Sequence, residues 1–246
     1  KVYISSDGNS PPKLRAINFD GSGKQTLIGG NANAADLVAD PRTGSVYIAD
    51  RAPNRIRKIE ADGSGYATLT HAGEEPFGID LDPVDNRLYW VERDLGRIRS
   101  SDLDGANVQT FLSGLSFPQT LAVDPVHRTL YWTDSNTRNI ERINLDGSGR
   151  TMILNDNSDH PRGLEVDPYA ERVYFTHVGR NRIEMVDLDG NGRTTILSGF
   201  GTPEHIEANW TFEPANTIPA PLAVVAGSVG MFFITRRKNL RNTLGT

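Results

Sequence analysis

Hydrophobic and polar residues alternate in four short segments that recur in the same order along the chain. The first segment ends in Asp-Pro, as in Leu-Ala-Val-Asp-Pro at 121–125, and the second is aromatic, as in Leu-Tyr-Trp-Thr-Asp at 130–134. A period of two is typical of a half-buried strand, and aromatic and β-branched residues favour a pleated sheet surface. Proline has no N–H to donate, so Asp-Pro ends the first strand in a turn. Each repeat therefore begins with two predicted strands.

The third and fourth segments of each repeat flank an Asp-Gly pair. Ile140, Ile143 and Leu145 precede one such pair, and a short apolar segment, 152–154, follows it. Asp-Gly between two extended runs is a strong hairpin signal, because glycine readily adopts the positive φ of a tight turn. The pattern predicts a second hairpin in every repeat. The pairs are Asp20-Gly21, Asp62-Gly63, Asp104-Gly105, Asp146-Gly147 and Asp189-Gly190.

The tyrosines of the second segment give the length of the repeat. Tyr3, Tyr47, Tyr89, Tyr131 and Tyr174 are separated by 44, 42, 42 and 43 residues. Four strands in a unit of this length predict a blade of a β-propeller, and the frequent Asp-Pro and Asp-Gly breaks exclude a helical repeat. We therefore expect an all-β propeller of five four-stranded blade-equivalents over residues 1–210. The chain starts at a tyrosine strand and its repeats end at a strand of the first type, 206–210, so we expect these terminal strands to pair and close the ring.

The composition changes after Trp210. Three prolines predict a linker at 211–221, and an apolar run, 222–234, is followed by the basic residues Arg236, Arg237 and Lys238. An apolar run stopped by clustered arginines is typical of a membrane segment with a cytoplasmic basic end. We expect residues 222–246 to be a helical anchor or sorting signal, with membrane contact through 222–238. The alternative is a hairpin, 220–227 and 230–236, that fills a partial sixth blade.

The repeats resemble a known family, the YWTD or class B repeats of the low-density lipoprotein receptor. The similarity covers residues 1–210, and Tyr131-Trp132-Thr133-Asp134 is the full motif. Domains of this family usually have six blades, whereas five repeats are counted here. The tail resembles the C-terminal sorting signals of exported bacterial proteins. The family resemblance implies a non-enzymatic extracellular binding platform, with structural roles for Tyr47, Asp50, Tyr89, Trp90, Tyr131, Trp132, Thr133, Asp134 and Tyr174.

The composition and the net charge exclude several kinds of functional site. The chain has no cysteine, which excludes disulfide frameworks, thiolate zinc sites and cysteine nucleophiles. A net charge of −5 disfavours a general nucleic-acid binder. The five histidines show no metal-ligand spacing, and no catalytic triad or phosphate loop is evident. We therefore predict no catalytic residue, no bound metal and no cofactor.

Two sets of residues are candidates for a site. Asp50, Glu92, Asp134 and His177 end successive tyrosine strands. They either form a ring around a central cation, as in propeller lactonases, or hydrogen-bond the neighbouring blade, as the family resemblance implies for the motif aspartate. The second set lies in loops before the first strand and after the tyrosine strand, where aromatic and arginine side chains are typical anchors of protein-binding surfaces. Its members are Arg51, Phe77, Arg93, Phe117, Asn136, His160, His177, Arg180 and Phe200.

These observations predict an exported or surface-tethered propeller that binds an extracellular protein or glycan through one face of the disc. The phenylalanines of that face could instead cap the blade cores. The alternative function is a metal-dependent propeller hydrolase or lactonase with a site in the central channel. The expected location is outside the cytoplasm, secreted or held at the cell surface by the tail.

Overall fold

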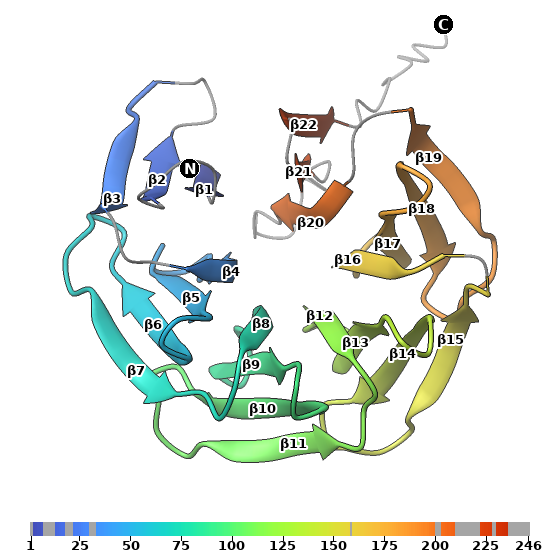
Figure 1. Ribbon diagram of the computed structural model, residues 1–246, viewed down its shortest axis with the longest axis horizontal. Helices are drawn as coiled ribbons and strands as arrows, with labels where there is room; N and C mark the ends of the chain where they lie inside the picture. The colour runs from blue at the N-terminus through green and yellow to red at the C-terminus, as the bar shows by residue number, and fades with distance from the viewer. Residues whose placement is uncertain are drawn as a thin grey trace, which may run out of the picture.

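The protein folds into six antiparallel sheets arranged around a central axis (Figure 1). A computed structural model describes residues 2–6, 13–17, 22–29, 33–157, 159–199, 203–209, 222–227 and 230–235. All regular elements in these residues are strands. The predicted all-β propeller is confirmed.

Four sheets are complete blades of four strands each. In each one the strand that ends in Asp-Pro lies nearest the axis, followed outward by the tyrosine strand, the third strand and the return strand (Figure 1). The four strands of a blade follow one another in sequence, so every connection within a blade is a hairpin. The strands are β4 (Ala34–Ala39), β5 (Val46–Asp50), β6 (Arg55–Ile59) and β7 (Ala67–His71); β8 (Pro76–Asp82), β9 (Arg87–Glu92), β10 (Arg97–Asp102) and β11 (Gln109–Ser113); β12 (Pro118–Asp124), β13 (Thr129–Asp134), β14 (Asn139–Asn144) and β15 (Thr151–Asn155); β16 (Pro161–Asp167), β17 (Arg172–His177), β18 (Arg182–Asp187) and β19 (Thr194–Ser198).

Two further sheets have three strands each. The first contains β1 (Val2–Ser6), β2 (Lys13–Ile17) and β3 (Gln25–Gly29), and it has no strand of the Asp-Pro type. The last contains β20 (Pro203–Asn209), β21 (Leu222–Gly227) and β22 (Gly230–Thr235). These two three-stranded sheets are the first and the last of the six sheets along the chain (Figure 1).

The predicted closure of the ring through the terminal strands is wrong. Strand β20 pairs with β21 and not with β1, with Asn209 opposite Leu222. Pairing with a nearby segment closes a far shorter loop than pairing with residues 2–6, and the loop-closure entropy is smaller. The tail thus supplies strands to a sixth sheet, which the count of five repeats did not include.

The predicted helical tail is also wrong for the residues that the structure describes. Leu222–Gly227 and Gly230–Thr235 are paired strands, with Gly227 opposite Gly230 at the end of the ladder. These bounds match the alternative hairpin. Within the described part of the chain, no helix has the length and apolar character needed to cross a bilayer. The expected linker, 211–221, and the basic residues 236–238 lie outside it.

Each core cluster lies between two adjacent blades. Tyr47 shares a cluster with Trp90 of the next blade, Tyr89 with Trp132, and Tyr131 with Phe175. Successive residues of a strand point to opposite faces, so the tyrosine packs on the following blade and the next residue packs on the preceding one. The Tyr-Trp pair therefore joins three blades through one strand.

The threonine of the full motif adds a polar contact between blades. The Thr133 hydroxyl donates to the carbonyl of Arg162 in the next blade at 3.0 Å, and accepts from the N–H of Thr120 at 3.3 Å. Tyr131, Trp132 and Thr133 are completely buried. A buried hydroxyl needs such partners, because an unpaired polar group in the core is costly.

The Asp-Gly turns have the backbone that the sequence predicts. Gly63, Gly105, Gly147 and Gly190 have φ values of 88°, 87°, 87° and 89°. This left-handed region is strained for residues with a Cβ. The predicted hairpins are confirmed at these four positions, and Asp20-Gly21 lies outside the described residues.

Candidate binding face

One hydrogen bond repeats at the same end of three blades. The N–H of the residue after the tyrosine strand donates to the carbonyl of the residue before the innermost strand. The pairs are Arg51 with Asn33 (2.9 Å), Arg93 with Glu75 (3.4 Å) and Ser135 with Phe117 (3.0 Å). Both sets of loops therefore lie on one face of the disc. The Asp-Gly turns lie at the opposite face, because the length of the third strand separates them from these loops.

The motif acids hold these loops in place. The Asp134 carboxylate accepts hydrogen bonds from the N–H groups of Ser116 (2.8 Å) and Phe117 (3.1 Å). Its other oxygen accepts from Asn136 and Thr137, at 3.2 and 3.1 Å. A carboxylate with several backbone donors is well stabilised despite its burial.

The same role recurs in two other blades. Asp50 accepts from the N–H of Asn33 at 3.1 Å, and Glu92 from the N–H of Gly73 at 2.8 Å. In every case the donor belongs to the loop that enters the acid's own blade. The expected hydrogen bond to the neighbouring blade is therefore wrong for these contacts. Asp50, Glu92 and Asp134 are at most 1% exposed, so these three acids do not form an accessible ring around a channel.

Arginine and phenylalanine side chains form a row across three blades on this face. The Arg93 guanidinium lies 4.5 Å from the ring centroid of Phe77 and 4.9 Å from that of Phe117. Arg51 lies 5.6 Å from the Phe77 ring. We name Arg51, Phe77, Arg93 and Phe117 the arginine–phenylalanine row. Glu75 forms an ion pair with Arg93 and holds its guanidinium in this position.

A pocket of about 440 Å³ lies beside the row. Glu74 and Asp94 are exposed at its wall, and Asn33 and Arg51 are linked there by a hydrogen bond of 3.1 Å. The wall is polar and carries charges of both signs, which suits a polar or basic side chain of a partner better than an apolar ligand. The lining residues are Asn33, Arg51, Asn54, Glu74, Glu75 and Asp94.

The other predicted face residues have different positions. Asn136, His160 and Arg180 are exposed, and His160 Nδ1 lies 2.8 Å from the carbonyl oxygen of Ser135. Phe200 lies outside the described residues. His177 is completely buried and cannot contact a partner, so its inclusion in the face is wrong.

The alignment of the phenylalanines needs correction as well. Pro76 and Pro118 begin equivalent strands, so Phe117, which precedes its proline, is equivalent to Glu75. Phe77 follows its proline, inside β8. The two rings belong to one row because Arg93 contacts both of them. The prolines that begin β8, β12, β16 and β20 were the signal that would have identified Glu75.

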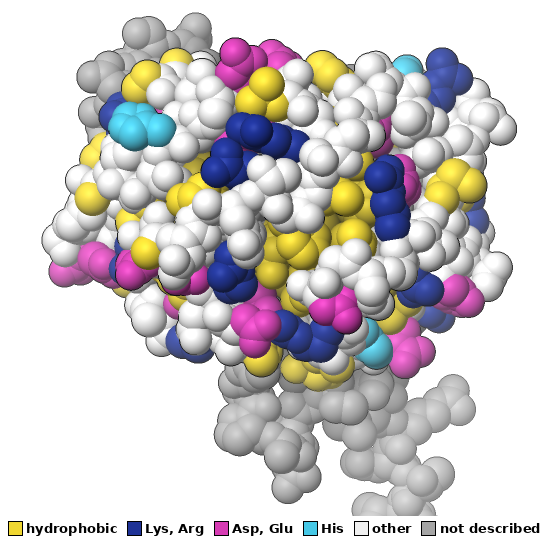
Figure 2. Space-filling view, turned by 90° about the horizontal axis from the view of Figure 1, so that it is seen from below, with side chains coloured by type: hydrophobic (Ala, Val, Ile, Leu, Met, Phe, Trp, Pro, Cys, Tyr) yellow, Lys and Arg dark blue, Asp and Glu magenta, His cyan; other side chains and the backbone are white. Residues whose placement is uncertain are grey.

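The edge of the disc has a different character. Figure 2 views the molecule from the side of β10 and β11 and shows hydrophobic side chains surrounded by basic and acidic ones. The two signs of charge alternate on this edge, and no continuous basic surface is visible there. Such a surface differs from the basic stripe of a nucleic-acid binder.

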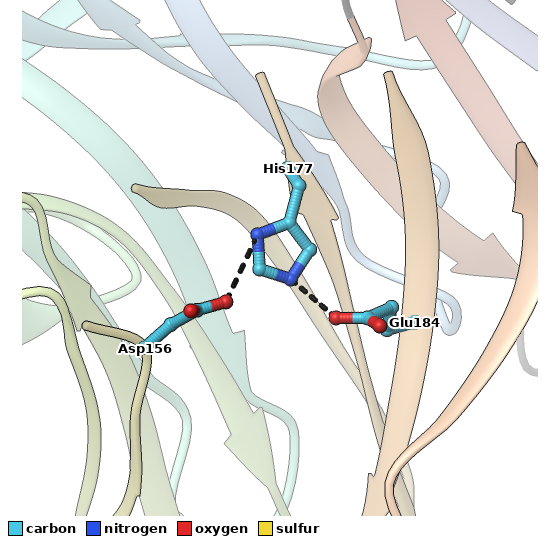
Figure 3. Close-up of side chains that lie close together, drawn as sticks. All are labelled: Asp156, His177 and Glu184. Carbon is cyan, nitrogen blue, oxygen red and sulfur yellow. Dashed lines mark ion pairs between the residues drawn. The ribbon is translucent and has the colours of Figure 1, made fainter. Parts of the chain in front are cut away.

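One polar cluster lies below the face, in the blade of β16 to β19. Among the described residues, Asp156, His177 and Glu184 are the group with the spacing of metal ligands (Figure 3). They come from a loop and from two different strands, β17 and β18. No sequence motif links them, and the sequence therefore predicted no metal at this position.

Comparisons with known proteins agree with this architecture. Residues 128–168 match the family model of the low-density lipoprotein receptor repeat class B. No curated protein matches the chain. Among solved structures, the chain is similar to one in the crystal structure of a nidogen/laminin complex, at 21% identity and a TM-score of 0.75, over 91% of this chain and 88% of that one.

A second group of similar structures has a catalytic function. Virginiamycin B lyase from Staphylococcus aureus, as its selenomethionine form, is 18% identical with a TM-score of 0.65, over 96% of this chain and 84% of that chain. The catalytically inactive H270A lyase with quinupristin is 19% identical with a TM-score of 0.64, over 95% and 83%. At these identities the similarity establishes the fold, a β-propeller. The function has to be argued from the residues of the site.

Proposed function

Because the chain is a propeller that carries a class B repeat of the low-density lipoprotein receptor type at 128–168, we propose that it is a non-enzymatic binding propeller. It recognises an extracellular protein through the face that carries the arginine–phenylalanine row. The observation that carries this proposal is the position of Arg93 between Phe77 and Phe117. Arginine and aromatic residues are the side chains that most often dominate binding energy at protein interfaces.

The row favours a protein over a glycan as the partner. Arg51 and Arg93 both lie over the ring of Phe77, which leaves less of the ring for stacking on a sugar. The exposed acids Glu74 and Asp94 beside it suit a lysine or arginine side chain of the partner. The protein in the nidogen/laminin structure is a relative that is seen in a complex with another protein.

The proposed location is outside the cytoplasm, as the receptor-type repeat suggests. The absence of cysteine is compatible with an exported protein that does not depend on disulfides. Tethering through residues 222–238 is not part of the proposal, because residues 222–227 and 230–235 are strands of the sixth sheet.

Photo-crosslinking tests which face binds. We place benzoylphenylalanine at Glu74, beside the row, and in a second protein at Asp104, in an Asp-Gly turn of the opposite face. Both proteins are incubated with an extracellular extract of the source cells. We expect one saturable crosslinked protein from position 74 and none from position 104. Equal crosslinking from both positions, or none from either, contradicts the proposal.

Two substitutions relate the crosslink to the row. Arg93→Ala should reduce crosslinking from position 74 by at least about 10-fold, as expected for an anchor worth about 1.4 kcal/mol or more. Arg172→Ala is the matched control, because Arg172 lies at the other end of its blade and pairs with Asp187 at 2.7 Å. Circular dichroism confirms that both variants are folded. If the Arg93→Ala variant crosslinks from position 74 as strongly as the protein with Arg93, the surface is assigned wrongly.

The competing enzyme hypothesis has its own test. The structural similarity to virginiamycin B lyase makes quinupristin the substrate of choice. We expect no change in quinupristin during prolonged incubation, with or without added Mg²⁺, by mass spectrometry. Turnover that is lost on chelation would establish an enzyme and overturn the non-enzymatic function.

A further inference from the structure

The pocket beside the arginine–phenylalanine row joins two blades. Its walls come from the loops that enter the blades of β4 to β7 and β8 to β11, and from the turns that follow β5 and β9. Its volume of about 440 Å³ lies within the range of about 300–1,000 Å³ that is usual for ligand pockets. A partner that contacts the row also reaches this pocket, because Arg51 belongs to both.

The loop that carries Glu74 packs directly on a buried carboxylate. The N–H of Gly73 donates to Glu92 Oε1 at 2.8 Å, and a Cβ on Gly73 would lie 2.9 Å from Glu92 Oε2. Glycine permits this close approach of the backbone, whereas a residue with a Cβ would crowd Glu92. The next residue, Glu74, is held at the wall of the pocket by this contact, and its side chain is exposed.

A tight turn fixes the backbone of Asp94. The N–H of Gly96 donates to the carbonyl of Arg93 at 3.1 Å, and Gly96 has a φ of 56°. The N–H of Leu115 donates to the Gly96 carbonyl at 2.9 Å, which ties this turn to the loop before β12. The side chain of Asp94 is 50% exposed. Both acids of the pocket are therefore presented to solvent from a fixed backbone.

The charges of the pocket do not balance. Glu75 pairs with Arg93, and Asp94 lies 3.6 Å from the same guanidinium. Among the residues that the structure describes, Glu74 forms no hydrogen bond or ion pair, and Arg51 pairs with none of these acids. Three carboxylates and two guanidinium groups leave one negative charge uncompensated. This charge lies at Glu74.

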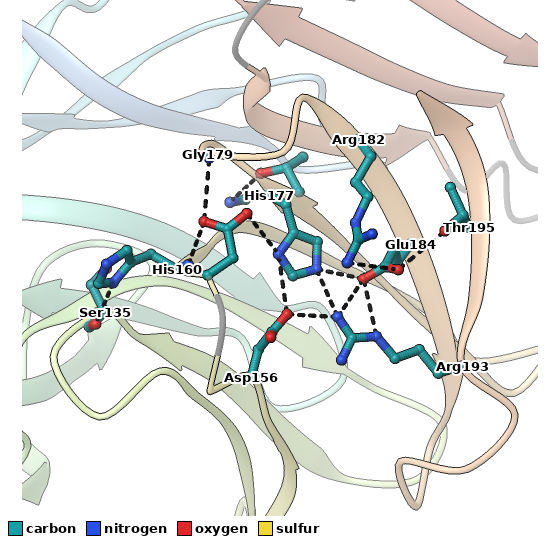
Figure 4. A network of polar contacts seen from close by, with 12 residues as sticks. Ser135, Asp156, His160, His177, Gly179, Arg182, Glu184, Arg193 and Thr195 are labelled. Atoms are coloured by element: carbon teal, nitrogen blue, oxygen red, sulfur yellow. Dashed lines mark hydrogen bonds and ion pairs between the residues drawn. The ribbon is translucent and has the colours of Figure 1, made fainter. Parts of the chain in front are cut away.

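The polar cluster of the fourth complete blade shows how this chain itself neutralises neighbouring acids. Arg193 Nη2 lies 2.6 Å from Asp156 Oδ2 and 2.6 Å from Glu184 Oε2, between the two carboxylates (Figure 4). Arg182 adds a second guanidinium at 3.3 Å from Glu184. These two acids are buried, and an internal guanidinium already takes the space between them. The pocket has no such internal cation at Glu74.

We propose that the pocket receives one basic side chain, a lysine or an arginine, that protrudes from the protein partner. This inference rests on the proposed function and adds the chemistry of the contact. Ammonium and guanidinium groups only donate hydrogen bonds, whereas the carboxylates of Glu74 and Asp94 only accept them. A basic side chain neutralises the uncompensated charge, whereas an acidic one repels it and an apolar one covers Glu74 without pairing it.

The contact contributes to specificity more than to affinity. Glu74 and Asp94 are exposed, so water and salt screen their charges. Charges at the rim of an interface mainly direct the approach of a partner and select its orientation. We therefore expect the row to supply most of the binding energy, and the pocket to select partners with a basic residue at this point.

Short peptides test the pocket without the partner. Acetyl-Gly-Lys-Gly-amide, acetyl-Gly-Arg-Gly-amide and the norleucine analogue are titrated into the ¹⁵N-labelled protein and followed by NMR. At millimolar concentrations we expect the two basic peptides to shift the backbone amide signals of Asn54, Glu74 and Asp94, and the norleucine peptide to leave them unchanged. The basic peptide with the higher affinity identifies the preferred side chain. No shift at these amides, or equal shifts with norleucine, overturns the proposal.

Two charge-matched variants separate the pocket from the overall charge. The double variant Glu74→Gln and Asp94→Asn should weaken binding of the basic peptides by about 3- to 10-fold, as expected for exposed ion pairs. The control, Asp104→Asn and Asp146→Asn, removes the same charge from exposed Asp-Gly turns of the opposite face, where asparagine also suits the turn. It should leave the affinity unchanged. Equal weakening in both variants, or none in the first, contradicts the pocket.

The peptide titration is independent of the crosslinking test. Benzoylphenylalanine at position 74 removes one acid of the pocket, so that crosslink reports the face and not the pocket. A crosslinked partner together with peptides that do not bind refutes the pocket alone. Peptides that bind when no partner crosslinks refute the proposed function, while the pocket keeps its preference for basic side chains.

Discussion

Gly190, in the Asp-Gly turn of one blade, lies against the backbone of Ile153 in the outer strand of the preceding blade. A Cβ on Gly190 would be 1.8 Å from the Ile153 carbonyl oxygen. Gly105 has the same relation to Leu69, at 2.7 Å. These turns therefore have two functions, because they reverse the chain and also fill the junction between blades. At Gly147 no atom lies within 4 Å of such a Cβ.

Gly190→Ala should destabilise the protein much more than Gly147→Ala. Both residues have a positive φ, 89° and 87°, so both substitutions cost about 1–2 kcal/mol in backbone strain. Only Gly190→Ala adds a clash with the neighbouring backbone, worth a further ~1–3 kcal/mol. Urea unfolding of the two variants measures the difference. Equal destabilisation would show that the blades separate at this junction without cost.

Arg93→Lys should be destabilising even though the charge is kept. The planar guanidinium of Arg93 contacts two rings and Glu75, and a lysine ammonium cannot reproduce both stacking contacts. We expect a loss of about 1 kcal/mol for Arg93→Lys. In a protein that already carries Phe117→Leu, Arg93→Lys should cost less stability, because one stacking partner of Arg93 is absent. A double-mutant cycle by chemical denaturation measures this coupling, and a coupling of zero contradicts the stacking.

Truncation of the tail distinguishes a blade from an anchor. Removal of residues 222–246 eliminates β21 and β22 and exposes the edge of β20. A loss of about 2 kcal/mol would lower the Tm by roughly 4–8 °C in a chain of this size. Removal of residues 236–246 alone, beyond β22, is the control and should leave the Tm unchanged. Equal Tm values for both truncations, with membrane localisation of the full chain only, would favour the anchor.

Stability should fall at alkaline pH because of Tyr47. Burial, followed by the nearby charges of Asp40 and Glu60, raises the pKa of Tyr47 to about 12. The unfolded chain releases this proton near pH 10, so the stabilisation is complete below pH 10 and is lost between about pH 10 and 12. The expected slope is about 1.4 kcal/mol per pH unit.

Tyr47→Phe isolates this effect. The variant should lack the Tyr47 contribution to the alkaline slope and keep the contributions of Tyr89 and Tyr131, whose pKa values burial also raises. Urea unfolding at several pH values between 9 and 11.5 compares the two proteins. An identical pH dependence would mean that the Tyr47 hydroxyl ionises freely in the folded state.

Much of the blade could be predicted because its signals are local. The φ of Gly105 follows from Asp104-Gly105, and the end of β12 follows from Asp124-Pro125. The equivalence of Glu75 and Phe117 in successive blades was missed, because the alignment used the phenylalanines and not the prolines. The sixth sheet with β21 and β22 was only the alternative interpretation of the tail, because an apolar run followed by basic residues has the composition of both a strand and a membrane segment.

By itself the sequence determined the periodic features: the strand order within a blade, the turns, and the alternation that places Tyr131 and Trp132 on opposite faces. Each depends on residues that are close in the chain, where steric and hydrogen-bonding preferences act directly. Only the tertiary structure decided which side chains of different segments meet. Arg93 between Phe77 and Phe117, and His177 between Glu184 and the loop acids Asp156 and Asp159, depend on how the segments pack and how a buried charge finds its partners.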